Sequence, residues 1–266
     1  MTSRKTVGFT IIETVLFLAI TGLLVLGLLV AVSSSVNIQR YNDASETLKS
    51  VLQEQYSRVT NVQNARSESL RCTNAGGVED TGLGEVVGQS PCTIVGRYMT
   101  IHGGDINIYT VLARQHPTTI NASNDIADIL NNYNLNLSAD DVEIREMEWG
   151  TEIAWPSSGA GAQTPQTPRE IALLFLRSPE SGRVYTFSSN TTQTPAQIKD
   201  MNPDTAPNFL RDILSNTPGG QSAVTLCIES GGLFDFGKRA IFINSYASSN
   251  TAIELKTNDM LVGQQC

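Results

Sequence analysis

The sequence predicts an α+β protein in which a long amino-terminal helix packs on a head made of antiparallel β-sheet. Three observations lead to this fold class. An apolar stretch whose one charged residue is Glu13 begins near residue 9, a helical pattern continues from it without proline to residue 66, and the pattern then shifts towards alternation. A chain of 266 residues is long enough to bury a core of its own.

The apolar stretch predicts a membrane-spanning helix. Fifteen of the 18 residues from Val15 to Val32 are apolar and none is charged. Counted as residues 9–32 the stretch would be ~36 Å long as a helix, enough to cross a bilayer. Arg4 and Lys5 stand in front of it, so the positive-inside rule places the amino terminus in the cytoplasm and everything after Val32 outside.

Glu13 stands inside this apolar block. A carboxylate there costs roughly 2.5–3.5 kcal/mol on the translocon scale, so a permanent helix that meets a cationic partner explains it better than a signal peptide does. The plainer alternative remains a cleaved, alanine-rich signal peptide that ends near Ser35.

The leader and the first apolar residues resemble a known family. The string Lys5-Thr6-Val7-Gly8 followed by Phe9-Thr10-Ile11-Ile12-Glu13 is similar to the class III signal of type IV pilins and type II secretion pseudopilins. The resemblance implies that residues 1–8 are a leader peptide and that prepilin peptidase cuts between Gly8 and Phe9. It also implies that the same enzyme methylates the new amine of Phe9.

The same resemblance implies an assembly role for Glu13. Its carboxylate would pair with the protonated amine of Phe9 in a neighbouring subunit, and such a pair is strong in low dielectric only when it is complete. The alternative is a carboxylate that is merely neutralised in the membrane. Many major pilins carry a proline later in this helix, whereas this chain has Val30 at the matching place.

Residues 33–66 are expected to form the amphipathic half of the same helix. Glu46 and Lys49, and likewise Glu54 and Arg58, are spaced to pair on its outer face. The apolar residues recur mostly at steps of three and four; they are Tyr41, Ala44, Leu48, Val51, Leu52, Tyr56, Val59 and Val62. This stripe predicts that the second half of the helix packs on the head, residues 67–266.

Within the head, alternating patterns and turn residues predict mostly strands. A glycine-rich loop should join Cys72 to Cys92, a short helix should cover Asp125–Tyr133 after a Ser123 or Asn124 cap, and a brief helix should lie around Phe209–Leu214. The expected strands are 94–101, 106–113, one or two within 142–155, the hairpin 170–177 and 183–188, and then 223–229, 233–244 and 251–256. The stretch 227–255, together with VGRYMTI at 95–101, is similar to the GspH/FimT class of minor pilins and pseudopilins.

Four cysteines in an exported domain predict two disulfides, for which three pairings are possible. Proximity in the sequence favours Cys72–Cys92 and Cys227–Cys266. The second resembles the loop that a disulfide closes at the carboxyl end of many pilins. A zinc site is the alternative, but it favours close pairs such as C-x-x-C, which are missing.

The sequence offers little support for catalysis, a metal or a cofactor. It has no G-x-S-x-G, phosphate-loop or H-E-x-x-H motif. His102 and His116 lie 14 residues apart and lack an obvious partner. Asp200, Asn202 and Asp204 have the spacing of a calcium loop, but Thr205 and Arg211 stand where the EF-hand needs glycine and glutamate. We therefore expect no enzyme activity and no bound metal.

Basic turn residues leave DNA binding open as an alternative. Lys238 and Arg239 follow a glycine and could contact DNA, with Arg97 and Arg183 as possible additions. The opposing interpretation is that these are solvated turn charges. The chain carries a net charge of −8, and removing the leader makes it −10, which disfavours a phosphate-binding surface.

These observations together predict a structural subunit of a type IV pilus or of a type II secretion pseudopilus. A head of roughly 200 residues exceeds that of a compact major pilin, which favours a minor subunit. Its expected partners are prepilin peptidase, the membrane and other subunits, which the helix would contact. It should begin as a single-pass prepilin in the cytoplasmic membrane, with the head outside, and then enter a surface pilus or a periplasmic pseudopilus. The alternatives are a DNA- or surface-binding minor pilin and an unrelated signal-anchored envelope protein.

Overall fold

The computed structural model describes residues 10–62, 70–74, 76–80, 85, 88–156, 168–193, 209–215, 222–230, 238–257 and 266. The chain divides into two compact units, Met1–Asn42 and Asp43–Cys266. We call the first the amino-terminal unit and the second the head unit. The predicted fold class is confirmed, because one long apolar helix is followed by antiparallel sheets that its second half contacts.

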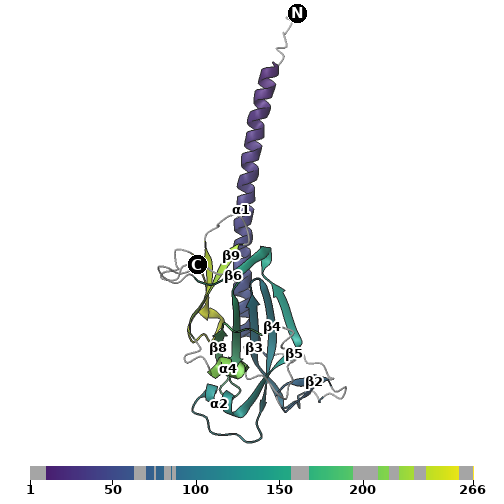
Figure 1. Ribbon diagram of the computed structural model, residues 1–266, viewed down its shortest axis with the longest axis vertical. Helices are drawn as coiled ribbons and strands as arrows, with labels where there is room; N and C mark the ends of the chain where they lie inside the picture. The colour runs from purple at the N-terminus through teal and green to yellow at the C-terminus, as the bar shows by residue number, and fades with distance from the viewer. Residues whose placement is uncertain are drawn as a thin grey trace, which may run out of the picture. The chain divides into compact units, whose positions relative to one another are not determined.

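Helix α1 spans Ile11–Thr60, which is 50 residues (Figure 1). No proline interrupts it, and it passes through the membrane-length apolar segment into the amphipathic segment without a break. By length and composition its first part could cross a membrane. Helical periodicity therefore predicted the type and the start of this element well.

The predicted end of this helix, at Arg66, is wrong: α1 ends at Thr60, and Asn61 and Val62 are not helical. The Thr60 hydroxyl donates a hydrogen bond back to the carbonyl oxygen of Tyr56. Threonine and asparagine are weak helix formers because their side chains offer the backbone such competing bonds. Val62 is 39% exposed, so the apolar stripe also ends before it.

Two antiparallel sheets form most of the head unit (Figure 1). The five-stranded sheet has the order β5-β4-β3-β7-β8, with β3 at Cys92–His102, β4 at Asp105–Gln115, β5 at Tyr133–Glu146, β7 at Glu170–Arg177 and β8 at Val184–Ser189. The four-stranded sheet has the order β11-β10-β9-β6, with β6 at Thr151–Ala154, β9 at Val224–Ser230, β10 at Arg239–Ile243 and β11 at Ile253–Thr257.

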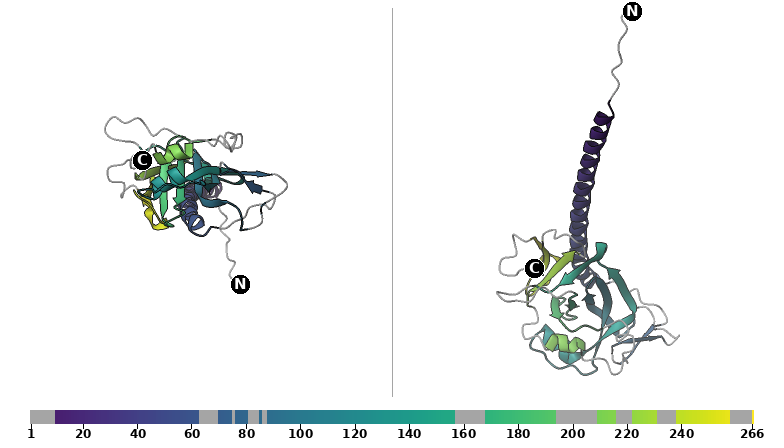
Figure 2. Two further views of the ribbon diagram at one scale, coloured as in Figure 1. Left: turned by 90° about the horizontal axis from the view of Figure 1, so that it is seen from below. Right: turned by 45° about the horizontal axis from the view of Figure 1, so that its top comes forward.

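Shorter elements complete the described part of the head unit. Helix α2 covers Asp125–Asn132, and Asn124 caps it by accepting a hydrogen bond from the Ala127 amide. Helix α4 covers Phe209–Ser215 and lies beside α2 (Figure 2). A small hairpin, β1 at Leu70–Cys72 and β2 at Val78–Asp80, lies where the sequence predicted a loop that begins at Cys72. The other predicted helices and strands are present, and most of their ends differ from the predicted ones by a few residues. The start of β5 was predicted wrongly, because β5 begins at Tyr133 and not at Val142. The first part of the predicted strand 233–244 lies outside the described residues.

The five-stranded sheet has a buried layer on each face. On one face, Tyr56 of α1 packs edge-on against Phe175 of β7, with 5.0 Å between the ring centroids. The α1 side chains buried in the head unit include Ala44, Leu48, Val51, Leu52, Tyr56 and Val59. The neighbouring β7 residues Leu174 and Leu176 belong to a second cluster, which includes residues of α2 and α4. Strand β7 is therefore buried on both faces, as its apolar sequence indicates.

A seam of backbone hydrogen bonds joins the two sheets. The Ile153 amide donates to the Gly103 carbonyl at 3.0 Å, and the Arg169 amide donates to the Ile153 carbonyl at 3.0 Å. The Arg169 side chain crosses the same seam, where Nη1 donates to the Thr225 carbonyl and the guanidinium lies 4.4 Å from the Trp155 ring centroid. Burial lowers the pKa of Arg169 to about 10.

Both disulfides follow the pairing that sequence proximity favours. Cys72 of β1 is bonded to Cys92 of β3, and Cys227 of β9 is bonded to Cys266. The second bond lies in a buried cluster with Ala154 and Ala240. All four cysteines are therefore paired, which leaves no thiolate for a zinc site.

Removal of the Tyr56 hydroxyl should destabilise the head unit by about 1–2 kcal/mol. Thr186 Oγ1 donates to the Ala247 carbonyl at 2.9 Å, so its lone pair must accept the 2.7 Å hydrogen bond from Tyr56. Tyr56→Phe leaves that buried oxygen without its donor. Thermal unfolding of the chain in detergent, followed by near-ultraviolet circular dichroism, measures the loss. Tyr246→Phe is the matched control because Tyr246 is 71% exposed, and an equal effect of the two changes would contradict the prediction.

Glu54 should make the head unit lose stability in acid. Burial acts to raise its pKa, but the hydrogen bond from Arg58 and the charges of Arg145 and Arg58 outweigh burial and hold the pKa below its ordinary value. A carboxyl with a lowered folded pKa stabilises the fold above its unfolded pKa, and this stabilisation is lost as the pH falls through the folded pKa.

We therefore expect Glu54→Gln to lower the melting temperature near neutral pH and to make little difference near about pH 3. The effect should stay within about 1 kcal/mol because the Glu54 side chain is 35% exposed. Glu79→Gln, on the exposed surface of β2, is the control. If Glu54→Gln lowers the melting temperature equally at both pH values, the stabilising role of the Glu54 charge is contradicted.

Candidate assembly site and head surfaces

The first half of α1 exposes a continuous apolar surface. Its large apolar side chains from Ile11 to Val32 are between 50% and 83% exposed. Burying one such side chain completely lowers the free energy by about 1.5–3 kcal/mol. Exposing all of them to water is therefore strongly unfavourable. Among the described residues nothing covers it. This segment is therefore built to contact a bilayer, other apolar helices, or both.

Glu13 forms a reciprocal cap with Thr10 at the start of this helix. The Glu13 carboxylate oxygen Oε2 accepts hydrogen bonds from the Thr10 amide and from the Thr10 hydroxyl, each at 3.0 Å. The Thr10 hydroxyl in turn accepts from the Glu13 amide at 3.3 Å. This is a capping box, in which two otherwise unpaired backbone donors at the helix end are satisfied.

The capping box gives Glu13 a local role that the sequence analysis missed. Threonine three residues before glutamate, directly ahead of an apolar run, is the sequence signal for it. The box compensates part of the cost of placing the carboxylate at the edge of an apolar segment. Both bonds end on Oε2, so Oε1 can still accept a donor from another molecule. Local capping and intermolecular pairing are thus compatible.

The predicted cleavage and methylation positions, Gly8 and Phe9, lie outside the described residues. The same holds for residues 200–208, which contain the predicted calcium-like spacing. Among described residues, no group of three or more histidine, cysteine or acidic side chains is arranged to hold a metal ion.

An apolar groove in the head unit lies between α1 and the end of β5. It has a volume of about 240 Å³, below the ~300–1,000 Å³ that small-molecule sites have. Its buried apolar residues are Ala44, Leu48, Val51, Ile106 and Met147. Its polar rim is formed by Thr47, Arg145, Glu146 and Glu148. We call it the α1–β5 groove.

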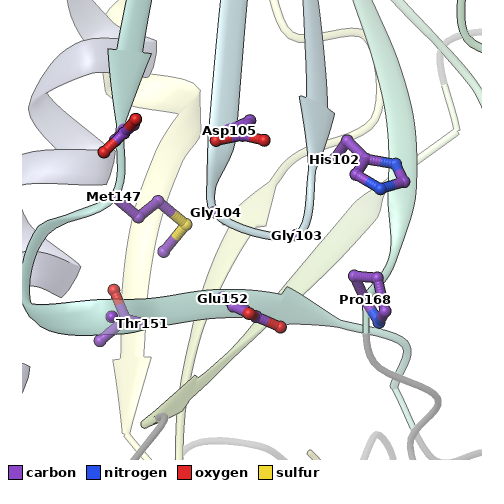
Figure 3. A pocket seen from close by; sticks show the side chains of 10 residues that line it. His102, Gly103, Gly104, Asp105, Met147, Thr151, Glu152 and Pro168 are labelled. Atoms are coloured by element: carbon purple, nitrogen blue, oxygen red, sulfur yellow. The ribbon is translucent and has the colours of Figure 1, made fainter.

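A second, polar cleft of about 340 Å³ lies at the turn between β3 and β4 (Figure 3). Gly103, with φ 58°, allows this tight turn, and a Cβ there would come within 2.9 Å of Pro168. Asp105, Glu146 and Glu152 line the cleft, and His102 Nδ1 lies 2.8 Å from Glu170 Oε1. The cleft is acidic and open, and its carboxylates are not grouped as metal ligands are.

The four basic residues considered for DNA do not form one surface. Arg97 faces Asp141 at 3.5 Å, and its side chain is only 13% exposed. Arg239 lies near the β3–β4 turn. It is opposite Ile228 in the four-stranded sheet, Ile228 is opposite Ile153, and the Ile153 amide donates a hydrogen bond to the Gly103 carbonyl of that turn. Arg183 precedes β8 at the opposite end of the five-stranded sheet, because Glu170 of β7 pairs with His102 while Arg177 pairs with Val184. Lys238, next to Arg239, is at the β3–β4 end.

Comparisons of the chain with protein-family models, with curated proteins and with solved structures found no match. The resemblance to pilins therefore depends on the leader motif and on the architecture alone. A long apolar amino-terminal helix packed on antiparallel sheets is consistent with a pilin-like architecture.

The capping box can be tested separately from any role of the charge. Thr10→Ala should speed amide hydrogen exchange in the first turn of α1 by about 2- to 30-fold, which corresponds to the ~0.5–2 kcal/mol that such caps contribute. Glu13→Gln should cause a smaller acceleration than Thr10→Ala, within about twofold of the parent chain, because a glutamine oxygen can accept the same bonds. The measurement is exchange by mass spectrometry in detergent micelles. Equal acceleration by both changes would show that the box needs the charge.

Proposed function

We propose that this chain is a structural subunit of a type IV pilus or of a type II secretion pseudopilus, and specifically a minor pilin or pseudopilin. The observation that carries the proposal is the division of α1. Its first half exposes large apolar side chains, and its second half buries one apolar face in the head unit. A subunit that is stored in a membrane and then packed helix-to-helix in a filament requires both properties.

The amino-terminal chemistry follows from this proposal. Prepilin peptidase removes residues 1–8 on the cytoplasmic side and methylates the Phe9 amine. The amine, still a cation, then pairs with Glu13 of a neighbouring subunit, where Oε1 is open to a donor. In a low-dielectric surrounding an unpaired charge is costly, so the pair favours the register in which both partners are present.

The head is proposed to lie outside the cytoplasm. Disulfides form and persist in oxidising compartments, and all four cysteines of the chain are paired. Removing the leader places Phe9 one residue before the Thr10 cap of α1. The alternative cut near Ser35 falls inside α1, which continues unbroken for another 25 residues after it. The role proposed is structural rather than catalytic.

The amino terminus of the protein in cells tests the processing step. We expect mass spectrometry of the envelope fraction to find a chain that begins with N-methyl-Phe9, and deletion of prepilin peptidase to leave Met1 in place. A chain that retains Met1 in normal cells, or that begins near Ser35, would overturn the proposal.

Three substitutions separate the charge of Glu13 from its capping role. Glu13→Gln keeps an oxygen for the cap but removes the charge, so we expect normal membrane levels and at least a tenfold loss from sheared filaments. Glu13→Val should insert into the membrane as well as Glu13→Gln does, and its amount in sheared filaments should fall to the same extent. Thr10→Ala, which weakens the cap and keeps the charge, should reduce incorporation by no more than about threefold. Wild-type incorporation of Glu13→Gln would refute the assembly role of the charge.

A further inference from the structure

We propose that the α1–β5 groove receives the exposed helical stripe Val32–Val36–Arg40 of a second copy of this chain. The inference depends on the proposed function, because it needs subunits that lie side by side. It names the surface of the head that contacts a neighbour, in addition to the pairing of Glu13. Three observations lead to it: the size of the groove, its charge and the pattern of the stripe.

The size and lining of the groove fit aliphatic side chains. Leu48, Val51 and Ile106 are each at most 5% exposed, so the groove has a fixed apolar wall from α1 and β4. Its volume of about 240 Å³ is too small for a typical small-molecule ligand. A hollow of this size and polarity is filled best by one or two branched apolar side chains of a protein.

The rim of the groove carries negative charge at Glu146 and Glu148 that no ion pair among the described residues neutralises. Arg145 is the basic group on the rim, and its guanidinium is held by Glu54 at 3.0 Å and by Glu143. Glu146 and Glu148 are exposed, and within the described ranges neither forms an ion pair. The groove therefore selects an apolar segment that is followed by a cation.

The exposed stripe on α1 has this chemistry. Val32 is 58% exposed and Val36 is 37% exposed, and Arg40 is exposed one turn further along. Steps of four residues place all three on one face, about 6 Å apart along the axis. With Val36 seated in the groove, the Arg40 side chain is long enough to reach a carboxylate on the rim.

The contact joins two different surfaces, so it is heterologous. Each copy would offer one stripe and one groove, and the association would continue from copy to copy instead of closing into a dimer. This property suits a filament subunit. It also requires at least two neighbouring copies, so a subunit present strictly once per filament would exclude the proposal.

Charge reversal tests the pairing in cells. Arg40→Glu should reduce the amount of chain in sheared filaments by about tenfold at unchanged membrane level, and Glu146→Arg with Glu148→Arg should do the same. Combining all three changes should restore incorporation to within about twofold of wild type. The matched controls are Arg71→Glu and Glu79→Arg, on the exposed faces of β1 and β2, which should leave incorporation unchanged.

Cysteine cross-linking tests the contact even where a charge variant fails to fold. The natural cysteines are all paired, so Val36→Cys with Thr47→Cys adds one thiol on the stripe and one on the groove. Mild oxidation of membranes should give a ladder of covalent dimers, trimers and longer products. Each single variant should give no ladder, and Val36→Cys with Glu79→Cys should give none either.

The outcomes separate this inference from the proposed function. Wild-type chain found in filaments, but with no rescue by the combined charge change and no ladder, overturns the groove contact and leaves the subunit role intact. Dimers from Val36→Cys alone, without longer products, show a symmetric helix contact and also overturn it. Wild-type chain that is absent from filaments overturns the proposed function, and the ladder in membranes then decides the contact by itself.

Discussion

The structure depends on one helix that must suit two surroundings. From Val15 to Val32 helix α1 is uncharged and almost entirely apolar, and from Ala44 onwards it has one apolar face that is buried and one polar face that is not. An α-helix can make this change because its backbone hydrogen bonds are internal in both surroundings. With no proline between the two parts, the chain stays helical through the change.

The elements that could be predicted are those whose signals are local. The stripe of α1, the Asn124 cap and the hairpin turn before Arg183 each lie within a few residues of the structure they specify. Sequence distance also favoured the correct cysteine pairs, because both close short loops. The two-sheet arrangement could not be predicted, since β6 pairs with β9 across more than 70 residues. The α1–β5 groove and the polar cleft could not be predicted either, because segments that are distant in the sequence form them.

Glu13 has a local role besides the intermolecular one that its sequence position predicts. Its place in an apolar block indicates a cationic partner in another subunit, yet its hydrogen-bond donors in this chain belong to Thr10, three residues earlier. The capping role and the proposed pairing role would support each other. A carboxylate that already accepts two hydrogen bonds costs less to hold in a membrane, and its position would already be fixed when the amine of a neighbouring subunit arrived. A freely rotating glutamate would lose more entropy in forming the same pair.

The two proposed contacts would act on different properties of assembly. Pairing at Glu13 would take place where water is scarce, so it would favour the correct register strongly without depending on the identity of the head. A contact at the α1–β5 groove involves exposed charges at Glu146 and Glu148, which contribute modestly to affinity and more to the choice of partner. Because the first contact would be available to any processed subunit with a similar helix, selection among subunits must come from head surfaces such as this groove. Strong, general attraction in the membrane and weak, specific attraction at the head would together allow subunits to be exchanged until the matching neighbour is found.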